Sequence, residues 1–316
     1  MTKPFVRPDV RHLLDQIAAA NAPPASQLGV EGARAIMKQL AALDAPAPDL
    51  AVIRDLEMVG PSGDAIPLRL HDARERREPG PALLYLHGGG FTIGDRDCYQ
   101  PLCSELARAL DMPVISVEYR LAPECPWPAA ADDCEAVARW LAASPAQLGL
   151  DVTGIVLCGD SAGGNLTAVT AMALRDEPAA APVLLQWLFY PLTDMSGSYK
   201  SMRQFAKGYF LDLREIVFFN ECYAADGAHW RGSPMLGEAA GLPSALIHTA
   251  GLDPLRDHGR AYAAKLAEAG VPTTYLEAEG TVHSFAILRG ALPSGQADLA
   301  QSVTAAKALL GLALSA

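Results

Sequence analysis

Basic residues are few in this sequence of 316 residues. Lys and Arg total 25 against 36 Asp and Glu, which gives a formal net charge of −11 with neutral histidines. Proteins that bind nucleic acid usually carry a basic patch or stripe that neutralises phosphates, and no run of basic residues of that kind is present. The sequence therefore argues against nucleic acid as a partner.

Long apolar runs and secretion signals are also lacking. No stretch of 18 apolar residues occurs, and residues 1–9 have no apolar core of the kind that signal peptides contain. The six cysteines form no C-x-x-C pair and have no histidine at metal spacing, which argues against a disulfide framework and against a metal site. We therefore expect a cytoplasmic protein with reduced cysteines and no integral membrane segment.

What the sequence does contain is a regular alternation of secondary structure. Segments with strand character alternate with segments of helical periodicity, which is typical of a mostly parallel sheet covered by helices on both faces. The predicted strands are 52–59, 66–70, 82–86, 114–118, 155–158, 183–190, 245–249 and 273–276, and the predicted helices are 102–110, 129–142, 166–174, 257–269 and 297–310. The first two strands flank a turn-rich segment that is suited to a hairpin.

Two parts of the chain do not fit the alternation. Near the N-terminus, apolar residues recur at helical spacing from Val10 to Ile17 and from Ile36 to Leu43, which predicts two amphipathic helices. Residues 196–233 hold many aromatic residues and fit an insertion. Isolated amphipathic helices are stable only when their apolar faces lie on something larger. A lid over a pocket and simple packing on the core are both open for the N-terminal pair.

The strand 155–158 runs directly into Gly159-Asp160-Ser161-Ala162-Gly163. A strand that ends at G-x-S-x-G and continues into a helix holds the serine at a sharp, strained turn. The helix that follows directs its free amides at the same place, and the amide of Ala162 would be one of them. The pattern predicts a nucleophilic serine at position 161. Asp160 fits capping of the helix or fixing of a neighbouring loop.

A serine nucleophile needs a base and an acid that orients the base. His283 follows the last predicted strand and Asp253 follows the strand before it, so both would leave the same edge of the sheet as Ser161. The order Ser, Asp, His is typical of α/β-hydrolases. Asp257 is a rival acid, but its place in the first turn of a helix favours a structural role. We predict that His248, inside an apolar strand, is a hydrogen-bonded core residue.

Three glycines follow the strand 82–86 and His87. They allow the backbone to approach a substrate and to turn its amides inward, as in the HGGG loop of lipases and esterases. We predict that the amides of Gly88, Gly89 and Ala162 form an oxyanion hole, and that His87 anchors the loop. A phosphate-binding loop is the competing interpretation, but neither G-x-x-x-x-G-K-[ST] nor a G-x-G-x-x-G before a helix is present.

With these motifs in this order, the sequence resembles the hormone-sensitive lipase family of α/β-hydrolases, also called bacterial family IV esterases. The resemblance covers nearly everything after about residue 50. It is carried by His87-Gly88-Gly89-Gly90-Phe91, Tyr119-Arg120-Leu121-Ala122-Pro123-Glu124, Gly159-Asp160-Ser161-Ala162-Gly163-Gly164, Asp253-Pro254-Leu255-Arg256-Asp257 and His283-Ser284-Phe285.

The resemblance implies an α/β-hydrolase fold, with a mostly parallel eight-stranded sheet flanked by helices. It implies a helical cap built from residues 1–50 and 190–235, on a core of residues 51–189 and 236–316. It also implies hydrolysis of short- to medium-chain carboxylic esters with no cofactor and no metal. Members often pair through the sheet edge, so a homodimer is compatible with the sequence. The GGG-type loop is similar to loops associated with room for bulky alcohol groups.

We therefore predict a serine carboxylesterase that acts on a small-molecule ester through an acyl-enzyme intermediate. An amidase or a lactonase with the same three residues stays open. A ligand receptor on the hydrolase scaffold also stays open, although plant gibberellin receptors, which resemble this family, lack the catalytic histidine. Apolar residues are candidates for the substrate pocket, although aromatic residues in an insertion also serve simple packing. The candidates are Phe91, Tyr209, Phe210, Leu211, Phe218 and Phe219.

Overall fold

An antiparallel hairpin begins the sheet, and a parallel series of strands continues it. The computed structural model describes residues 3–314, and β1 (Val52–Val59) pairs antiparallel with β2 (Ala65–Asp72). Strand β2 also pairs antiparallel with β4 (Val114–Val117), and every later pair is parallel. The eight strands lie in the order β1-β2-β4-β3-β5-β6-β7-β8. The others are β3 (Gly80–Leu86), β5 (Val152–Asp160), β6 (Val183–Phe189), β7 (Ala245–Ala250) and β8 (Thr273–Ala278). The predicted fold class is confirmed.

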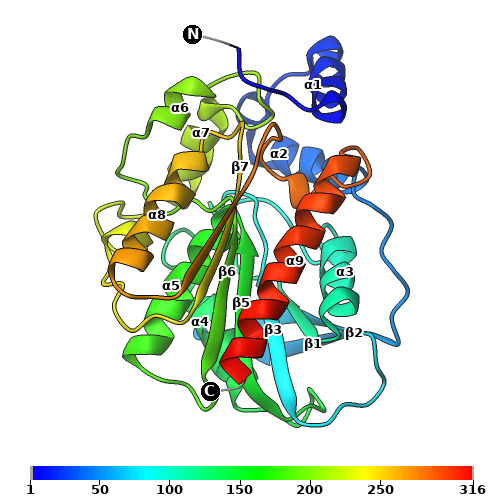
Figure 1. Ribbon diagram of the computed structural model, residues 1–316, viewed down its shortest axis with the longest axis vertical. Coiled ribbons are helices and arrows are strands. Elements are labelled where there is room, and N and C mark those ends of the chain that lie inside the picture. Colours follow the sequence, from blue (N-terminus) through cyan, green and yellow to red (C-terminus); the bar gives the residue numbers. More distant parts are fainter. Residues whose placement is uncertain (1–2, 315–316) are drawn as a thin grey trace.

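Helices cover both faces of the sheet because successive strand side chains point to opposite sides. Leu84 and Leu157 belong to the apolar cluster covered by α4, α5 and α8, whereas Leu83 and Val156 belong to the cluster covered by α3 and α9. Figure 1 shows α5 and α8 on one side of the strands and α3 and α9 on the other. The bounds of these helices are α3 (Gln100–Leu110), α4 (Ala129–Ala142), α5 (Ala162–Asp176), α8 (Arg256–Glu268) and α9 (Pro293–Leu314).

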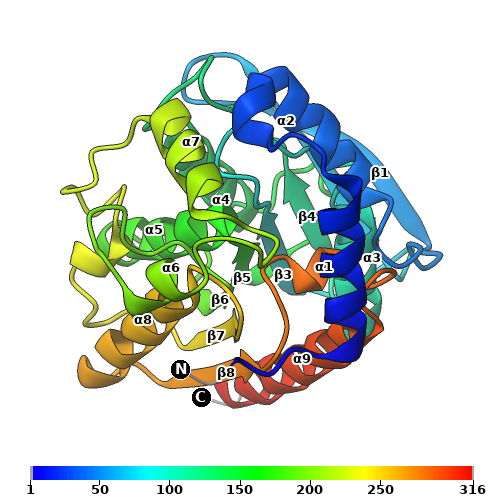
Figure 2. The same cartoon turned by 90° about the horizontal axis from the view of Figure 1, so that it is seen from above.

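Four further helices lie at the end of the molecule where the strands have their carboxyl ends (Figures 1 and 2). They are α1 (Pro8–Ala20), α2 (Ala25–Ala41), α6 (Lys200–Gln204) and α7 (Leu213–Tyr223), so both amphipathic helices predicted near the N-terminus are present. The amide and hydroxyl of Ser26 donate to the carboxylate of Glu215 at 3.1 and 2.8 Å, which links α2 to α7. The division of the chain into cap and core at residues 50, 190 and 235 stays a prediction.

The N-terminal segment is also bound to the core. Val10, Leu13 and Leu14 of α1 are buried in the same apolar cluster as α3 and α9. Beyond α2, the carboxylate of Asp44 accepts two hydrogen bonds from the guanidinium of Arg289, at 2.8 and 2.7 Å. Ala33 and Met37 of α2 are buried in the same cluster, so both N-terminal helices pack on the core, and a lid over a pocket stays a prediction. Within residues 3–314, no helix is long and apolar enough to cross a membrane.

The ion pair of Asp44 and Arg289 permits a stability test. Both side chains are almost fully buried, at 1 and 2% exposure, so Asp44→Ala leaves a buried cation without its partner. We expect the free energy of unfolding to fall by about 3–5 kcal/mol, as measured by denaturant unfolding followed by circular dichroism. Glu105→Ala removes the partner of the more exposed Arg108 and should cost less than about 1 kcal/mol. Equal losses in the two variants would contradict this account.

Candidate active site

Ser161 stands at the sharp turn between β5 and α5. Its backbone has φ 55° and ψ −115°, which is strained for a residue that carries a side chain. The turn lies tightly against the end of β3. A Cβ on Gly159 would lie 2.6 Å from the carbonyl oxygen of Leu86, and a Cβ on Gly163 would lie 2.6 Å from that of His87. Glycine at both positions is therefore required by the close approach of two backbone segments.

His283 and Asp253 form a chain of hydrogen bonds with Ser161. Nε2 of His283 lies 2.9 Å from the Ser161 hydroxyl oxygen, and Nδ1 lies 2.7 Å from a carboxylate oxygen of Asp253. Asp253 follows β7 and is fully buried, and its other oxygen accepts the amide of Leu255 at 2.8 Å. With Nδ1–H donating to the carboxylate, Nε2 is the nitrogen that can take the serine proton.

The rival acid and the rival histidine lie elsewhere. Asp257 accepts the amide of Ser201 at 2.9 Å and pairs with Arg256, in the first turn of α8. His248 is fully buried, but neither of its ring nitrogens has a hydrogen-bond partner among the described residues. The prediction of a hydrogen-bonded core histidine is therefore wrong in that respect, because the ring faces the aromatic ring of Phe285, which offers no acceptor. Burial lowers the pKa of His248 to about 4.

The oxyanion loop, defined here as residues 87–93, does not present the first of its predicted donors. The amide of Gly88 already donates to the carboxylate of Asp160 at 2.7 Å. Gly88 is also buried, whereas Gly89 and Gly90 are partly exposed. The prediction that the Gly88 amide binds an oxyanion is therefore wrong, because this amide already donates its hydrogen bond to a buried carboxylate.

The next two amides of the oxyanion loop are free. In a trans peptide the N–H and the preceding C=O point in opposite directions. The Gly88 oxygen lies 2.7 Å from Nδ1 of His87, and the Gly89 oxygen accepts two amides further along the loop at 3.0 Å each. The amides of Gly89 and Gly90 therefore point away from these inner contacts. No acceptor within residues 3–314 is bonded to either of them or to the amide of Ala162.

Comparisons with known proteins agree with this geometry. A family described as alpha/beta hydrolase fold matches residues 83–287. Esterase LipI of Mycobacterium tuberculosis is 38% identical over 270 residues, which are 83% of each chain, and carboxylesterase NlhH of the same organism is 34% identical over 98% of this chain and 99% of its own. The chain belongs to the hormone-sensitive lipase family of α/β-hydrolases. Ester-hydrolase EH1AB1 from the metagenome of Lake Arreo, solved with a bipyridine phosphonate derivative, superposes with a TM-score of 0.92 at 37% identity, covering 97% of this chain and all of that one.

In this hydrolase the side chain of Asp160, at the end of β5, holds the oxyanion loop in place. Besides the Gly88 amide, its carboxylate accepts the hydroxyls of Tyr85 at 2.9 Å and Tyr99 at 3.3 Å. Complete burial raises the pKa of Asp160 to about 6, although the hydrogen bonds from Tyr85 and Gly88 act in the opposite direction. The prediction that Asp160 holds a neighbouring loop is confirmed, and none of the donors that its carboxylate accepts among the described residues belongs to α5.

His87 anchors the same loop, as predicted. Its ring stacks on Tyr119 with 4.2 Å between ring centroids, and the Tyr119 hydroxyl donates to the His87 carbonyl oxygen at 2.7 Å. Burial lowers the pKa of His87, so the neutral ring is favoured. The contacts of His87 are therefore structural.

Two residues that lie at this site, Gly90 and Tyr190, are not among those predicted from the sequence. Gly90 belongs to the glycine run, and the sequence does not distinguish its free amide from that of Gly88. Tyr190 is fully buried directly after β6, and its ring lies 4.7 Å from that of His283 between centroids. Tyr190 lies at the carboxyl end of the predicted strand 183–190, which follows the strand that leads to Ser161, and this position is the signal in the sequence that places it near the site.

The predicted pocket residues divide into two groups. Phe91 is fully buried and stacks on Tyr223 with 3.7 Å between ring centroids. It therefore cannot line a pocket that is open to solvent, and its assignment is corrected. The other candidates are all partly exposed on or beside α7, and their role stays a prediction: Tyr209, Phe210, Leu211, Phe218 and Phe219.

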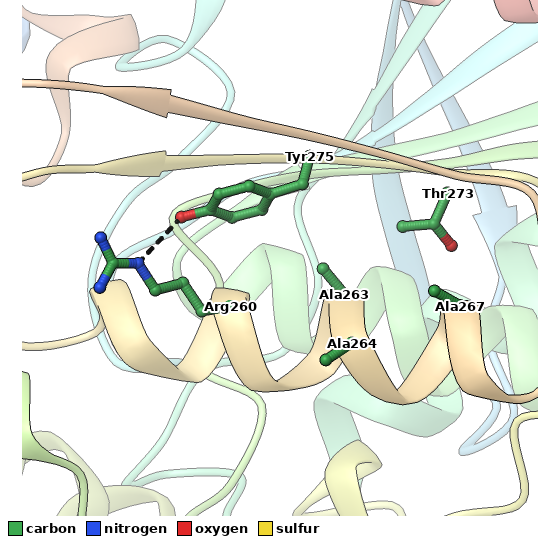
Figure 3. Close-up of a pocket in the computed structure, with 6 residues that line it drawn as sticks. All are labelled: Arg260, Ala263, Ala264, Ala267, Thr273 and Tyr275. Atoms are coloured by element: carbon green, nitrogen blue, oxygen red, sulfur yellow. Dashed lines mark hydrogen bonds between the residues drawn. The ribbon is translucent and has the colours of Figure 1, made fainter.

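A shallow surface pocket lies apart from these residues, between α8 and the edge strand β8 (Figure 3). Its lining includes Ala263, Thr273 and Tyr275, and the Tyr275 hydroxyl accepts a hydrogen bond from Arg260 at 3.4 Å. None of its lining residues contacts Ser161 or His283. Across the described part of the chain, no group of three or more His, Cys, Asp or Glu side chains is placed to hold a metal ion.

The buried charge of Asp160 should give a pH-dependent stability difference. Its folded-state pKa of about 6 exceeds the ordinary value of 3.8, so its contribution to stability is fully present below about pH 4 and is lost as pH rises towards 6. The unfolding free energy of the wild type, minus that of Asp160→Asn, should therefore fall by on the order of 1–3 kcal/mol between pH 4 and 7. Denaturant titrations across this range measure the difference. A flat or rising difference would contradict the account, and Asp49→Asn, at an exposed position, is the control.

Proposed function

We propose that this hydrolase is a serine carboxylesterase in which Ser161 is the nucleophile, His283 is the general base and Asp253 orients His283. Membership of the family supports the activity, since LipI and NlhH are named as an esterase and a carboxylesterase and resemble this chain over most of its length. The observation that carries the proposal is the continuous hydrogen-bond chain from the Ser161 hydroxyl through both nitrogens of His283 to Asp253.

The first half of the reaction forms an acyl-enzyme. The Ser161 oxygen attacks the ester carbonyl carbon while its proton moves to Nε2 of His283. The carbonyl oxygen becomes negative and accepts hydrogen bonds from the amides of Gly89, Gly90 and Ala162, each worth about 2.7–4 kcal/mol in comparable sites. The tetrahedral intermediate then collapses, and the departing alcohol takes the proton from His283. The acyl group remains on Ser161.

The second half repeats these steps with water. His283 takes a proton from a water molecule, whose oxygen attacks the acyl carbon and regenerates the oxyanion at the same amides. Collapse of this second intermediate releases the carboxylic acid and returns the proton to Ser161. In both halves one proton moves between an oxygen atom and Nε2 of His283, and one water molecule is consumed in the second half.

The substrates proposed are small esters with short or medium acyl chains. The partly exposed apolar residues on and beside α7 support an apolar acyl site close to Ser161. The six free cysteines, four of them buried, support a reducing, cytoplasmic location. A homodimer is proposed on the family resemblance alone.

Covalent labelling separates an esterase from a receptor on the same scaffold. A p-nitrophenyl alkylphosphonate should release one equivalent of p-nitrophenol and add its phosphonyl group to the peptide that contains Ser161, as measured by mass spectrometry. Reversible binding without labelling would favour the receptor. In parallel assays of matched ester, amide and lactone substrates, the enzyme should turn over the ester fastest. Faster turnover of the amide or the lactone would contradict the proposed esterase activity and indicate an amidase or a lactonase.

Ser161→Ala should abolish turnover without unfolding the chain. Removal of the nucleophile of a serine hydrolase lowers kcat by about 10⁴-fold or more, because the remaining residues cannot form the acyl-enzyme. Stopped assays with p-nitrophenyl butyrate measure the loss, and circular dichroism checks the fold. Ser62→Ala, on the exposed turn between β1 and β2, should retain wild-type kcat. Retained turnover in Ser161→Ala would remove the mechanism.

Asp160→Asn should lower kcat with a smaller effect on KM. The Gly88 amide and the Tyr85 hydroxyl donate to one oxygen of the carboxylate, and the Tyr99 hydroxyl donates to the other. The oxygen of an amide is neutral, so the charge-assisted hydrogen bond to Gly88 would weaken, and the Gly88 peptide and the amides after it would be held less firmly. We expect kcat to fall about tenfold to a hundredfold, which is less than the fall that removal of one oxyanion donor causes. Steady-state kinetics with p-nitrophenyl butyrate measure the split. An unchanged kcat would show that the loop holds its position without Asp160.

A further inference from the structure

Helix α7 lies directly on the oxyanion loop. Two of its aromatic residues, Phe219 and Tyr223, are four positions apart and therefore lie on the same face of the helix. Each contacts a different residue of the loop: Phe219 meets Gly90, and Tyr223 meets Phe91. The two contacts differ in burial, since Tyr223 is fully buried and Phe219 is partly exposed.

Tyr223 and Phe91 are the anchor. Both rings are fully buried, and they stack nearly parallel, with an interplanar angle of 5°. The Tyr223 carbonyl oxygen also accepts the amide of Trp127 at 2.9 Å, and the Phe91 carbonyl oxygen accepts the amide of Ala122 at 2.8 Å. The C-terminal end of α7 and the oxyanion loop are thus held to each other and to the segment that follows β4.

Phe219 stands at the open side of the same contact. A Cβ added to Gly90 would lie 2.6 Å from Cβ and 2.7 Å from Cδ2 of Phe219, so the Phe219 side chain leaves no room for even a methyl group there. Both residues are partly exposed, unlike the anchor pair. Phe219 therefore covers the Gly90 peptide while part of the residue remains accessible to solvent.

We propose that Phe219 limits the size of the substrate group that lies over the oxyanion loop. The inference rests on the proposed function, in which the Gly90 amide binds the carbonyl oxygen of the ester. A substrate held at that amide must place its nearest substituent beside the Phe219 ring, because the ring already touches Gly90. The space that a GGG-type loop leaves for bulky groups is thus partly filled from α7.

Two ester series test the proposal. One varies the alcohol from ethyl to isopropyl to tert-butyl acetate, and the other varies the acyl group from ethyl acetate to isobutyrate to pivalate. For Phe219→Ala, we expect the ratio of kcat/KM for the bulkiest ester to that for the smallest to rise at least tenfold in one series, since a few methyl groups in an apolar site change selectivity by about that factor or more. Phe219→Leu should give a smaller rise in the same series.

Val217→Ala is the matched control, because Val217 lies on the same helix and its side chain is exposed. Its selectivity ratios should stay within threefold of the wild-type values. Ratios in Phe219→Ala and Phe219→Leu that match those of Val217→Ala in both series would overturn the proposal. Should Phe219→Ala fail to fold, as judged by circular dichroism, the comparison of Phe219→Leu with Val217→Ala decides alone.

Failure of this inference can be told from failure of the proposed function. If the wild type is labelled by the phosphonate and Ser161→Ala is inactive, the proposed mechanism stands whatever the Phe219 variants do. If the ratios then remain unchanged, only the role of Phe219 is wrong. If neither turnover nor labelling is seen in the wild type, the proposed function itself fails, and this inference with it.

Discussion

The contact between the Asp160 carboxylate and the Gly88 amide determines how the oxyanion loop faces the rest of the site. Asp160 ends β5 and Gly88 follows β3, its neighbour in the sheet. A buried carboxylate without donors would be costly, so the hydrogen bonds from Gly88, Tyr85 and Tyr99 fix the first peptide of the loop. The carbonyl oxygens of Gly88 and Gly89 are bonded within the loop, which leaves the Gly89 and Gly90 amides free. The proposed oxyanion site thus depends on an acid that is itself buried.

The strand order explains why residues far apart in sequence meet. Strands β3, β5, β6, β7 and β8 are consecutive in the sheet and parallel, so their carboxyl ends lie along one edge. The segment after each strand places one feature at this edge: the oxyanion loop, Ser161, Tyr190, Asp253 and His283, in that order. The hydrogen-bond chain from Ser161 to Asp253 runs along this edge, and the sheet fixes its spacing.

The sequence was sufficient to predict Ser161, His283 and Asp253 as a group, because each stands in a local motif directly after a predicted strand. The choice between Gly88 and Gly90 could not be made from the sequence, since it depends on a carboxylate from another strand. Phe91 was misjudged for a similar reason: a loop aromatic looks the same whether it borders a pocket or stacks on Tyr223. Helix α5 begins at Ala162, four positions before the predicted range 166–174. Glycine disfavours a helix, but a Cβ on Gly163 would meet the end of β3 and a Cβ on Gly164 would meet Pro191 after β6, so tertiary contacts require both glycines.

In the proposed mechanism, helix α7 connects substrate binding to catalysis. It contacts α2 through Glu215 and Ser26 and contacts the oxyanion loop through Phe219 and Tyr223. A substitution that moved α7 would therefore change both the space beside the ester and the position of the Gly90 amide. A donor acts only within hydrogen-bond distance of the oxyanion. A movement of α7 would therefore change substrate selectivity and kcat together. Asp160 holds the loop at Gly88, and α7 contacts it at Gly90 and Phe91, so under the proposal the size of Phe219 is the feature through which this site would admit larger substrates.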